Sequence, residues 1–241
     1  LIDSNQNLVK TINFDSRKYI GDPFNAAYIF SNYEVDELLI LDIDASRFDK
    51  SISYDFVESL TNFTNVPLTI GGGIKNIEQI QKILSLGVER IVLSNYLNNN
   101  LNFLLDASNE FGSSTISVAL NIVKRNKDKY YGYFGIPNKY KRPHPLIELV
   151  KMVEDSGAGE IIINNVDNDG LMNGIDISIL EKVNNSVNIP VVGLGGCGNK
   201  NHIKKLLDKV NISGVACGSF FIYASDTKEV LLKYIGINQF L

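Results

Sequence analysis

The sequence resembles itself at an offset of 123 residues, about half of its length. Asn65-Val-Pro-Leu recurs as Asn188-Ile-Pro-Val, and glycine pairs follow both segments at the same offset. The matching positions are Gly72 and Gly195, Gly73 and Gly196, Glu37 and Glu160, Asp44 and Asp167, Asn76 and Asn199, and Ile80 and Ile203. Such an offset indicates two similar halves. Two four-strand halves that close into one barrel explain it, whereas an open doubly wound sheet does not.

Short apolar runs alternate with helix-period segments, which is typical of a parallel sheet covered by helices. For example, a helical pattern begins at Ile77 and ends at Gly87. Strands are expected at 38–43, 67–70, 90–94, 115–120, 160–163, 189–192 and 214–217. The length of 241 residues suits one barrel. We therefore expect residues 1–241 to form a single α/β domain, a (β/α)8 TIM barrel of the phosphate-binding type built from two (β/α)4 halves.

The composition excludes several classes of protein. A net charge of −4 argues against a nucleic-acid partner, and no apolar run is long enough to span a membrane. The two cysteines, Cys197 and Cys217, are too few for a disulfide scaffold, which favours a reduced cytoplasmic setting. Two histidines without Cys/His clustering predict no metal site, and we expect no cofactor.

Glycine-rich segments in both halves predict two phosphate sites. Gly72-Gly73 and Gly195-Gly196 each lie between a strand and a helix, where backbone N–H groups and the helix dipole favour an anion. Ser94-Asn95 and Gly218-Ser219 end the next strand of each half and are candidates to complete the sites. The repeat therefore predicts two anion sites at the C-terminal mouth of the barrel and a ligand with a phosphate at each end. Alternatively, the glycines serve only tight turns.

The order and spacing of several motifs resemble the cyclase subunit of imidazole glycerol phosphate synthase (HisF). The match runs from Lys10 to Ser219. Its motifs include Gly21-Asp-Pro23, Leu41-Asp-Ile43, Pro67-Leu-Thr-Ile-Gly-Gly-Gly-Ile74, Glu110-Phe-Gly112, Gly157-Ala-Gly-Glu160, Asp167-Asn-Asp-Gly170 and Asn188-Ile-Pro190.

This resemblance implies a chemistry and a partner. HisF takes ammonia from a glutaminase (HisH) and uses it to cleave and cyclise a ribulosyl nucleotide that carries two phosphates. Lys10, Asp169 and Gly170 correspond to residues around its phosphates. Glu37, Arg90 and Glu160 fall on a ring of charges that gates ammonia at the barrel floor, and the fourth position of the ring would precede Leu1. Alternatively, these charges only solvate the floor.

The two aspartates that do the acid–base work of HisF are where the resemblance fails. The one on strand 5 ends a Val-x-Ile-Asp run, which here reads Val118-Ala-Leu-Asn121. Ser117, Ala119 and Asn121 share one face of the strand, so Asn121 occupies the candidate catalytic position. Its amide can bind a substrate but cannot exchange a proton near neutral pH. Weak or absent histidine-pathway cyclase activity is the expected consequence.

The strand-1 aspartate has two alternative counterparts. It lies eight residues before the lysine that matches Lys10, and counting back without a gap reaches Ile2. Asp3 is one residue late, which would put its side chain on the other face of the strand. Either Asp3 points away from the pocket, or the loop 4–7 is one residue shorter and Asp3 is the catalytic residue.

Segments near the N-terminus resemble most closely a group of HisF-like paralogues associated with surface-polysaccharide genes. The segments are Lys10-Thr11, Lys18-Tyr-Ile-Gly-Asp-Pro23 and Glu34-Val-Asp-Glu-Leu38. That resemblance implies a heterodimer with a HisH-like glutaminase and, with a third amidotransferase protein, the amidation of a nucleotide-linked sugar. The alternatives are a genuine histidine-pathway cyclase and a non-catalytic barrel that channels ammonia. The directions of Ile2, Asp3 and Asn121 distinguish these classes.

Overall fold

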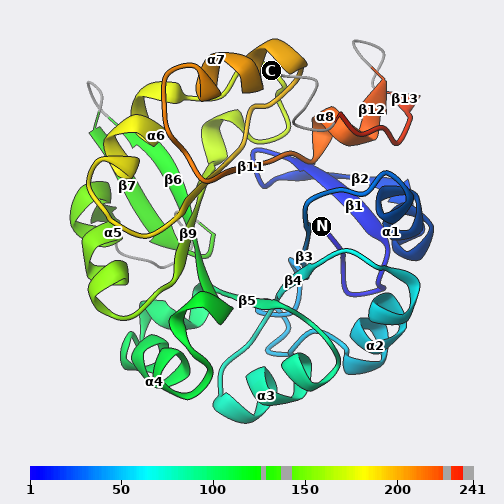
Figure 1. The fold of residues 1–241 in the computed structure, drawn as a ribbon, viewed down its shortest axis with the longest axis horizontal. Coiled ribbons are helices and arrows are strands. Elements are labelled where there is room, and N and C mark those ends of the chain that lie inside the picture. Colours follow the sequence, from blue (N-terminus) through cyan, green and yellow to red (C-terminus); the bar gives the residue numbers. More distant parts are fainter. Residues whose placement is uncertain (126–128, 137–142, 225–228, 236–241) are drawn as a thin grey trace.

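A ring of parallel strands surrounded by helices makes up the computed structural model, which describes residues 1–125, 129–136, 143–224 and 229–235 (Figure 1). Neighbouring strands around the ring are β3 (Leu38–Leu41), β4 (Leu68–Gly71), β5 (Arg90–Leu93), β6 (Ile116–Arg125), β9 (Glu160–Asn165), β10 (Val191–Leu194) and β11 (Gly214–Ala216). All pairs along this path are parallel.

A short stretch at the chain start takes the remaining strand position. Ile2 forms a parallel bridge with Asp42, just beyond β3. Its N–H donates to the carbonyl oxygen of Leu41 at 2.9 Å, and its own carbonyl oxygen accepts from Ile43 at 3.1 Å. With this stretch the sheet is nearly closed as a (β/α)8 barrel, which confirms the expected fold class.

Helices connect the strands and cover the outside of the ring. They are α1 (Pro23–Asn32), α2 (Tyr54–Phe63), α3 (Ile77–Ser85), α4 (Asn102–Phe111), α5 (Leu146–Asp155), α6 (Ile177–Asn184), α7 (Lys200–Leu207) and α8 (Ser219–Ile222). Short 3-10 turns lie at η1 (Asn95–Asn98), η2 (Ser113–Thr115) and η3 (Val166–Asn168). None of the helices in the described ranges is long and apolar enough to cross a membrane.

The internal repeat is visible in the structure. The bounds of β4 and β10 differ by the same 123 residues as the sequence motifs. Asn76 and Asn199 cap α3 and α7 in the same way, each accepting a backbone N–H three residues later. Because matching side chains perform matching local roles, the two halves are built alike.

Side chains alternate between two apolar layers along each strand. Val92, Ala119 and Ile162 meet inside the barrel with Leu39, Leu41, Val192 and Leu194 packed around them. Their neighbours Ile91, Val118 and Ile161 face outward and pack against the helices. This alternation fixes which polar residues face the barrel interior.

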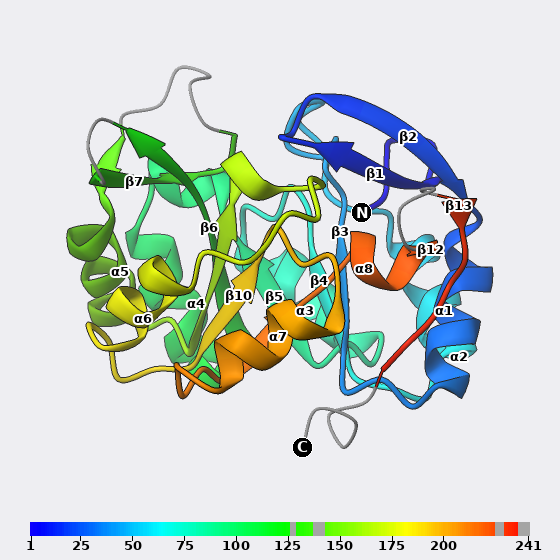
Figure 2. The ribbon, with the colours of Figure 1, turned by 90° about the horizontal axis from the view of Figure 1, so that it is seen from above.

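Two hairpins rise from the C-terminal end of the barrel (Figure 2). One pairs β1 (Leu8–Ile12) with β2 (Ser16–Gly21), and the other extends β6 to pair with β7 (Lys129–Phe134), which also pairs with β8 (His144–Pro145). The strand that the sequence predicted at 115–120 is shorter than β6, which continues to Arg125 because β7 pairs with its second half. A small hairpin of β12 (Tyr223–Ala224) and β13 (Glu229–Val230) follows α8.

Candidate functional site

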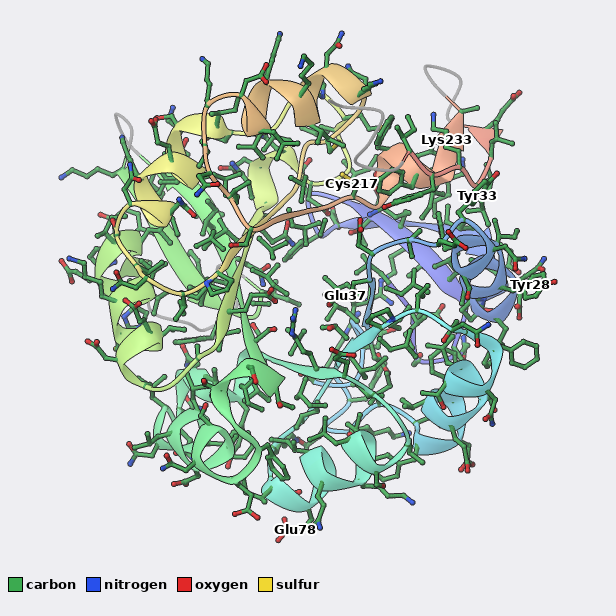
Figure 3. The ribbon with its side chains drawn as sticks, in the orientation of Figure 1. Tyr28, Tyr33, Glu37, Glu78, Cys217 and Lys233 are labelled. Carbon is green, nitrogen blue, oxygen red and sulfur yellow. The ribbon has the colours of Figure 1, made fainter. Side chains whose placement is uncertain are left out.

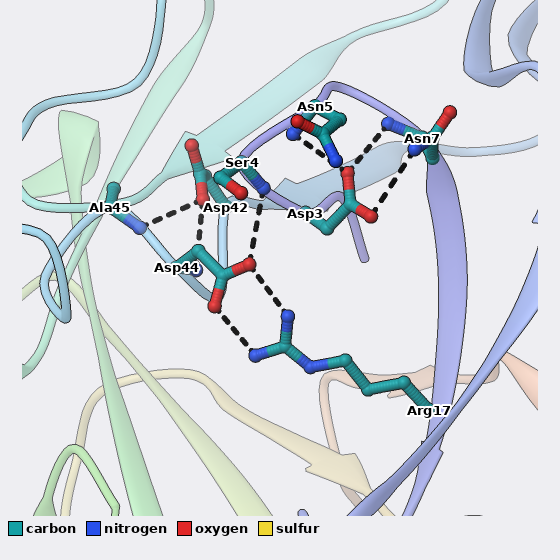
Figure 4. A network of polar contacts seen from close by, with 8 residues as sticks. All are labelled: Asp3, Ser4, Asn5, Asn7, Arg17, Asp42, Asp44 and Ala45. Carbon is teal, nitrogen blue, oxygen red and sulfur yellow. Dashed lines mark hydrogen bonds and ion pairs between the residues drawn. The ribbon is translucent and has the colours of Figure 1, made fainter.

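Asp3 lies on the inner side of the barrel wall. Ile2 is 1% exposed and packs in the outer layer with residues of the surrounding helices. Successive residues along an extended chain face opposite sides, so Asp3 faces inward. Its carboxylate accepts backbone N–H groups from Asn5 and Asn7, each at 2.9 Å, which shapes the tight loop that follows (Figure 4).

Asp44 organises the rim beside Asp3. The guanidinium of Arg17, on β2, donates to both of its carboxylate oxygens at 2.6 Å, and the N–H of Ser4 donates to one of them at 3.1 Å. The hydrogen bond from Arg17 holds the pKa of Asp44 below its ordinary value. This pair ties the β1–β2 hairpin to the loop after β3 (Figure 4).

A cavity of about 210 Å³ opens next to these groups. Asp3, Asp42, Asp44, Lys50 and Ser51 are among its lining residues. Burial raises the pKa of Asp42, although its side chain accepts hydrogen bonds from the N–H groups of Asp44 and Ala45. The cavity joins the strand-1 end to the loop before α2.

Asn121 also faces the barrel interior, and its amide orientation is fixed. Its Nδ2 donates to the carbonyl oxygen of Gly135 at 2.7 Å. The hydroxyl of Ser94 holds the same residue by accepting the N–H of Gly135 at 2.9 Å, and it donates to the carbonyl oxygen of Ala119 at 2.7 Å. By accepting the N–H of Gly135, the residue after β7, the Ser94 oxygen holds the end of that strand beside Asn121.

The first glycine loop, at Gly72 and Gly73, is packed so closely against other residues that no side chain would fit there. A Cβ added at Gly73 would lie 1.8 Å from the carbonyl oxygen of Lys50, and one added at Gly72 would lie 2.7 Å from the Cβ of Asp42. Gly73 has φ of +66°, a left-handed conformation that favours glycine. Asn95 begins η1, the turn that follows the neighbouring strand β5.

The second glycine loop lies near a buried lysine. Lys10 is 8% exposed, and its amine is so close to Gly218 that an added Cβ there would lie 2.6 Å from Nζ. Burial lowers the pKa of Lys10, while the nearby Asp169 opposes that shift.

Other residues of this second region are equally confined. Asp169 accepts the hydroxyl of Thr11 at 3.1 Å, and Ser219 is buried at the start of α8. A Cβ at Gly170 would lie 2.3 Å from the carbonyl oxygen of Thr11, one at Gly195 2.6 Å from that of Asn165, and one at Gly196 2.0 Å from that of Gly174. The structure therefore brings the members of the predicted second site into one region.

Arg90, Glu37 and Glu160 form an ion-pair cluster at the N-terminal floor. Nη1 of Arg90 lies 3.2 Å from Oε2 of Glu37 and 3.3 Å from Oε2 of Glu160. The other oxygen of Glu160 accepts the hydroxyl of Ser117 at 2.7 Å. Figure 3 shows Glu37 at the inner edge of the ring, with Glu78 and Tyr28 on its outer rim. The three charged positions thus converge on the barrel axis.

Sequence reasoning did not single out two interior residues that carry unpartnered polar atoms. Thr69 on β4 and Asn164 on β9 are buried, and neither Oγ1 of Thr69 nor Oδ1 of Asn164 has a hydrogen-bond partner in the described part of the chain. Strand register places Asn164 directly beside Asn121, and this neighbour makes Asn164 a candidate site residue. No cluster of three or more His, Cys, Asp or Glu residues within the described ranges is arranged to hold a metal ion.

Comparison with known proteins adds independent information. The family model described as "Histidine biosynthesis protein" matches residues 2–227. A Leptospira borgpetersenii protein named "Putative imidazole glycerol phosphate synthase subunit HisF" is 42% identical over 94% of this chain and 89% of its own length. The corresponding hisF2 protein of Pseudomonas aeruginosa is 33% identical over 99% and 95%. The HisF subunit of Lactococcus lactis is 33% identical over 95% and 90%.

Proposed function

This chain belongs to the histidine biosynthesis protein family as a HisF-like subunit, and from that premise we propose that it receives ammonia from a HisH-like glutaminase. We further propose that it acts with a third amidotransferase protein in the amidation of a nucleotide-linked surface sugar. Asn121 carries this proposal, because an amide replaces a proton-transferring aspartate while the charged floor and the glycine loops are present.

The floor cluster supports the ammonia route. Arg90 lies between Glu37 and Glu160 and blocks the floor of the barrel on its axis. Rotation of these side chains would break the two ion pairs and open the floor. Arg90 is about one-third exposed at this surface, so a docked partner could reach it. A glutaminase on the N-terminal face would deliver ammonia beneath the interior polar residues.

Proposed binding at the C-terminal mouth uses the two glycine regions. Gly72, Gly73 and Asn95 would hold one anion, with Ser94 fixing the neighbouring strand. Lys10, Gly170, Gly195, Gly196, Gly218 and Ser219 would hold the other, with Asp169 positioning Lys10. This arrangement suits a phosphorylated substrate such as a sugar nucleotide, and the inward-facing Asp3 favours a catalytic over a purely channelling role.

Association with the glutaminase is the direct test of the partner. Analytical ultracentrifugation of the purified chain with a HisH-like glutaminase from the same organism should show a one-to-one complex. Arg90→Glu should weaken the complex, whereas Arg47→Glu, an equal charge reversal in an exposed loop at the other end of the barrel, should not. Failure of the two wild-type proteins to associate would refute the proposed partnership.

Genetic complementation separates the proposed function from its main alternative. A histidine auxotroph that lacks HisF should not grow without histidine when it carries this gene together with that of its glutaminase. The proposed amidation would place an amidino group on a sugar of the surface polysaccharide, and deletion of the gene from its native host should remove that group. Growth of the auxotroph at the rate given by an ordinary HisF would establish the histidine-pathway alternative instead.

A further inference from the structure

Asn121 and Asn164 lie side by side on the inner face of the barrel. They are register partners on the parallel strands β6 and β9. Ala119 and Ile162, two residues earlier on the same strands, belong to the interior layer, so both amides face inward. Asn164 is next to the last residue of β9, and both amides lie above the floor cluster of Arg90 and the glutamates.

The orientation of Asn121 leaves its oxygen available. Because Nδ2 donates to the carbonyl oxygen of Gly135, the other end of the amide, Oδ1, must point elsewhere. Within the described residues Oδ1 of Asn121 accepts no hydrogen bond. The position therefore offers the barrel interior a neutral acceptor that the surrounding backbone holds in place.

Asn164 presents a second acceptor with no protein partner. Its side chain is 8% exposed, and Oδ1 is buried without a hydrogen bond among the described residues. It lies under Gly195, where an added Cβ would be 3.3 Å away. A buried unpaired acceptor costs free energy, about 1–3 kcal/mol in proteins, so its retention points to a ligand that donates to it.

We infer that Asn121 and Asn164 form an acceptor pair that binds an N–H donor, either ammonia arriving through the barrel or the substrate nitrogen that it becomes. This inference deepens the proposed function and rests on it. Two neutral oxygens suit this ligand because each N–H needs an acceptor, and neither amide can take the proton from it. Asn164 thereby becomes a specificity-determining residue that sequence motifs alone did not indicate.

The experiment uses ammonium chloride as the probe and potassium chloride as its control. Potassium has the same charge but has no N–H groups to donate. In ¹⁵N-labelled protein, ammonium should shift the side-chain amide resonances of Asn121 and Asn164 saturably, whereas potassium at equal concentration should not. Equal responses to both salts, or no response to either, would overturn the inference.

Paired variants distinguish a ligand site from a structural amide. Asn164→Leu should raise the apparent dissociation constant for ammonium at least about tenfold. The same variant should keep the melting temperature of the ligand-free protein or raise it by roughly 2–4 °C, since it removes an unpaired acceptor. Asn165→Leu is the matched control: its side chain caps η3 by accepting from Asp167 at 3.1 Å, so this variant should lower stability and leave the ammonium response intact.

The outcomes separate this inference from the proposed function. If Asn164→Leu destabilises the protein as Asn165→Leu does and ammonium still binds, Asn164 is structural and the inference fails. That result would leave the complex with the glutaminase unaffected. Loss of that complex in wild-type protein would refute the proposed function instead, whatever the amide resonances show.

Discussion

Ile2 lies opposite Asp42 as a parallel β-bridge, and this single pairing decides the direction of Asp3. The Ile2 side chain fills the layer between sheet and helices, so the aspartate that follows it faces the barrel interior. This is the direction that the second alternative left open by the sequence requires, and a catalytic role for Asp3 stays a prediction.

This direction predicts how acid–base chemistry could be restored. Asn121→Asp alone should raise turnover of the histidine-pathway ribulosyl nucleotide, measured with saturating ammonium salt, by about 10²-fold or more, because one positioned acid–base group contributes roughly 10²–10⁴-fold. Asp3→Asn in that background should remove the gain. Ile2→Asp should instead destabilise the protein, since it buries a charge in the outer layer. Wild-type turnover equal to that of an ordinary HisF would contradict the assigned roles.

The ion pair of Arg17 and Asp44 predicts a pH-dependent stability. The hydrogen bonds from Arg17 depress the pKa of Asp44 below its ordinary value of 3.8. The pair therefore contributes its full stabilisation above about pH 4, and the contribution is lost as pH falls through the lower folded pKa. Asp44→Asn should cost roughly 1–3 kcal/mol at pH 7 and less near pH 2, as measured by urea unfolding across that range.

Asp49 supplies the control for the ion pair of Arg17 and Asp44. It forms an ion pair with Lys75, but its side chain is 91% exposed, whereas that of Asp44 is 3% exposed. Exposed pairs contribute little, so Asp49→Asn should change stability by less than about 0.5 kcal/mol at either pH. Equal effects of the two substitutions would show that burial does not distinguish them.

Periodic and repeated features were readable from the sequence, whereas features set by register were not. The offset of 123 residues predicted the barrel, and matching caps at Asn76 and Asn199 confirm its two similar halves. The resemblance to HisF implied that Glu37, Arg90 and Glu160 lie in one ring at the barrel floor, and the structure pairs Arg90 with both glutamates. The repeat lies within the chain itself, and the motifs are short stretches of sequence, so a single sequence suffices to detect them.

Other elements depend on contacts that no spacing reveals. The extension of β6 to Arg125 needs β7 as a partner, since its polar end would not form a strand alone. The commitment of the Ser94 hydroxyl to Gly135 arises from residues 41 positions apart. Asn164 carries no motif, and its importance appears only when its neighbour across the strand is known.

Steric crowding at Gly73 predicts that Gly73→Ala lowers the stability of the protein by more than its left-handed backbone alone would. Gly73→Ala would place a Cβ against the carbonyl oxygen of Lys50, which cannot move without displacing the loop before α2. Gly87, which follows α3, also has a positive φ, but an added Cβ there meets nothing within 4 Å. Both substitutions should cost about 1–2 kcal/mol for the left-handed backbone, and Gly73→Ala should cost more. Thermal unfolding of the two variants measures this difference, and equal costs would contradict the crowding.

We expect the amine of Lys10 to contribute much of the affinity of the second anion site for phosphate. Burial lowers the pKa of its amine in the ligand-free protein, and a bound phosphate beside Gly218 would supply a counter-charge. Inorganic phosphate should therefore raise the melting temperature, and Lys10→Met should weaken phosphate binding on the order of 10–100-fold, since a hydrogen bond to a charged group contributes roughly 1.5–3 kcal/mol. Lys82→Met, on the exposed side of α3, removes the same charge far from the glycine loops and should leave phosphate binding unchanged. If Lys10→Met retains the full phosphate-dependent rise, the lysine does not contact the anion, and the second site must rest on the backbone of Gly196 and Gly218 alone.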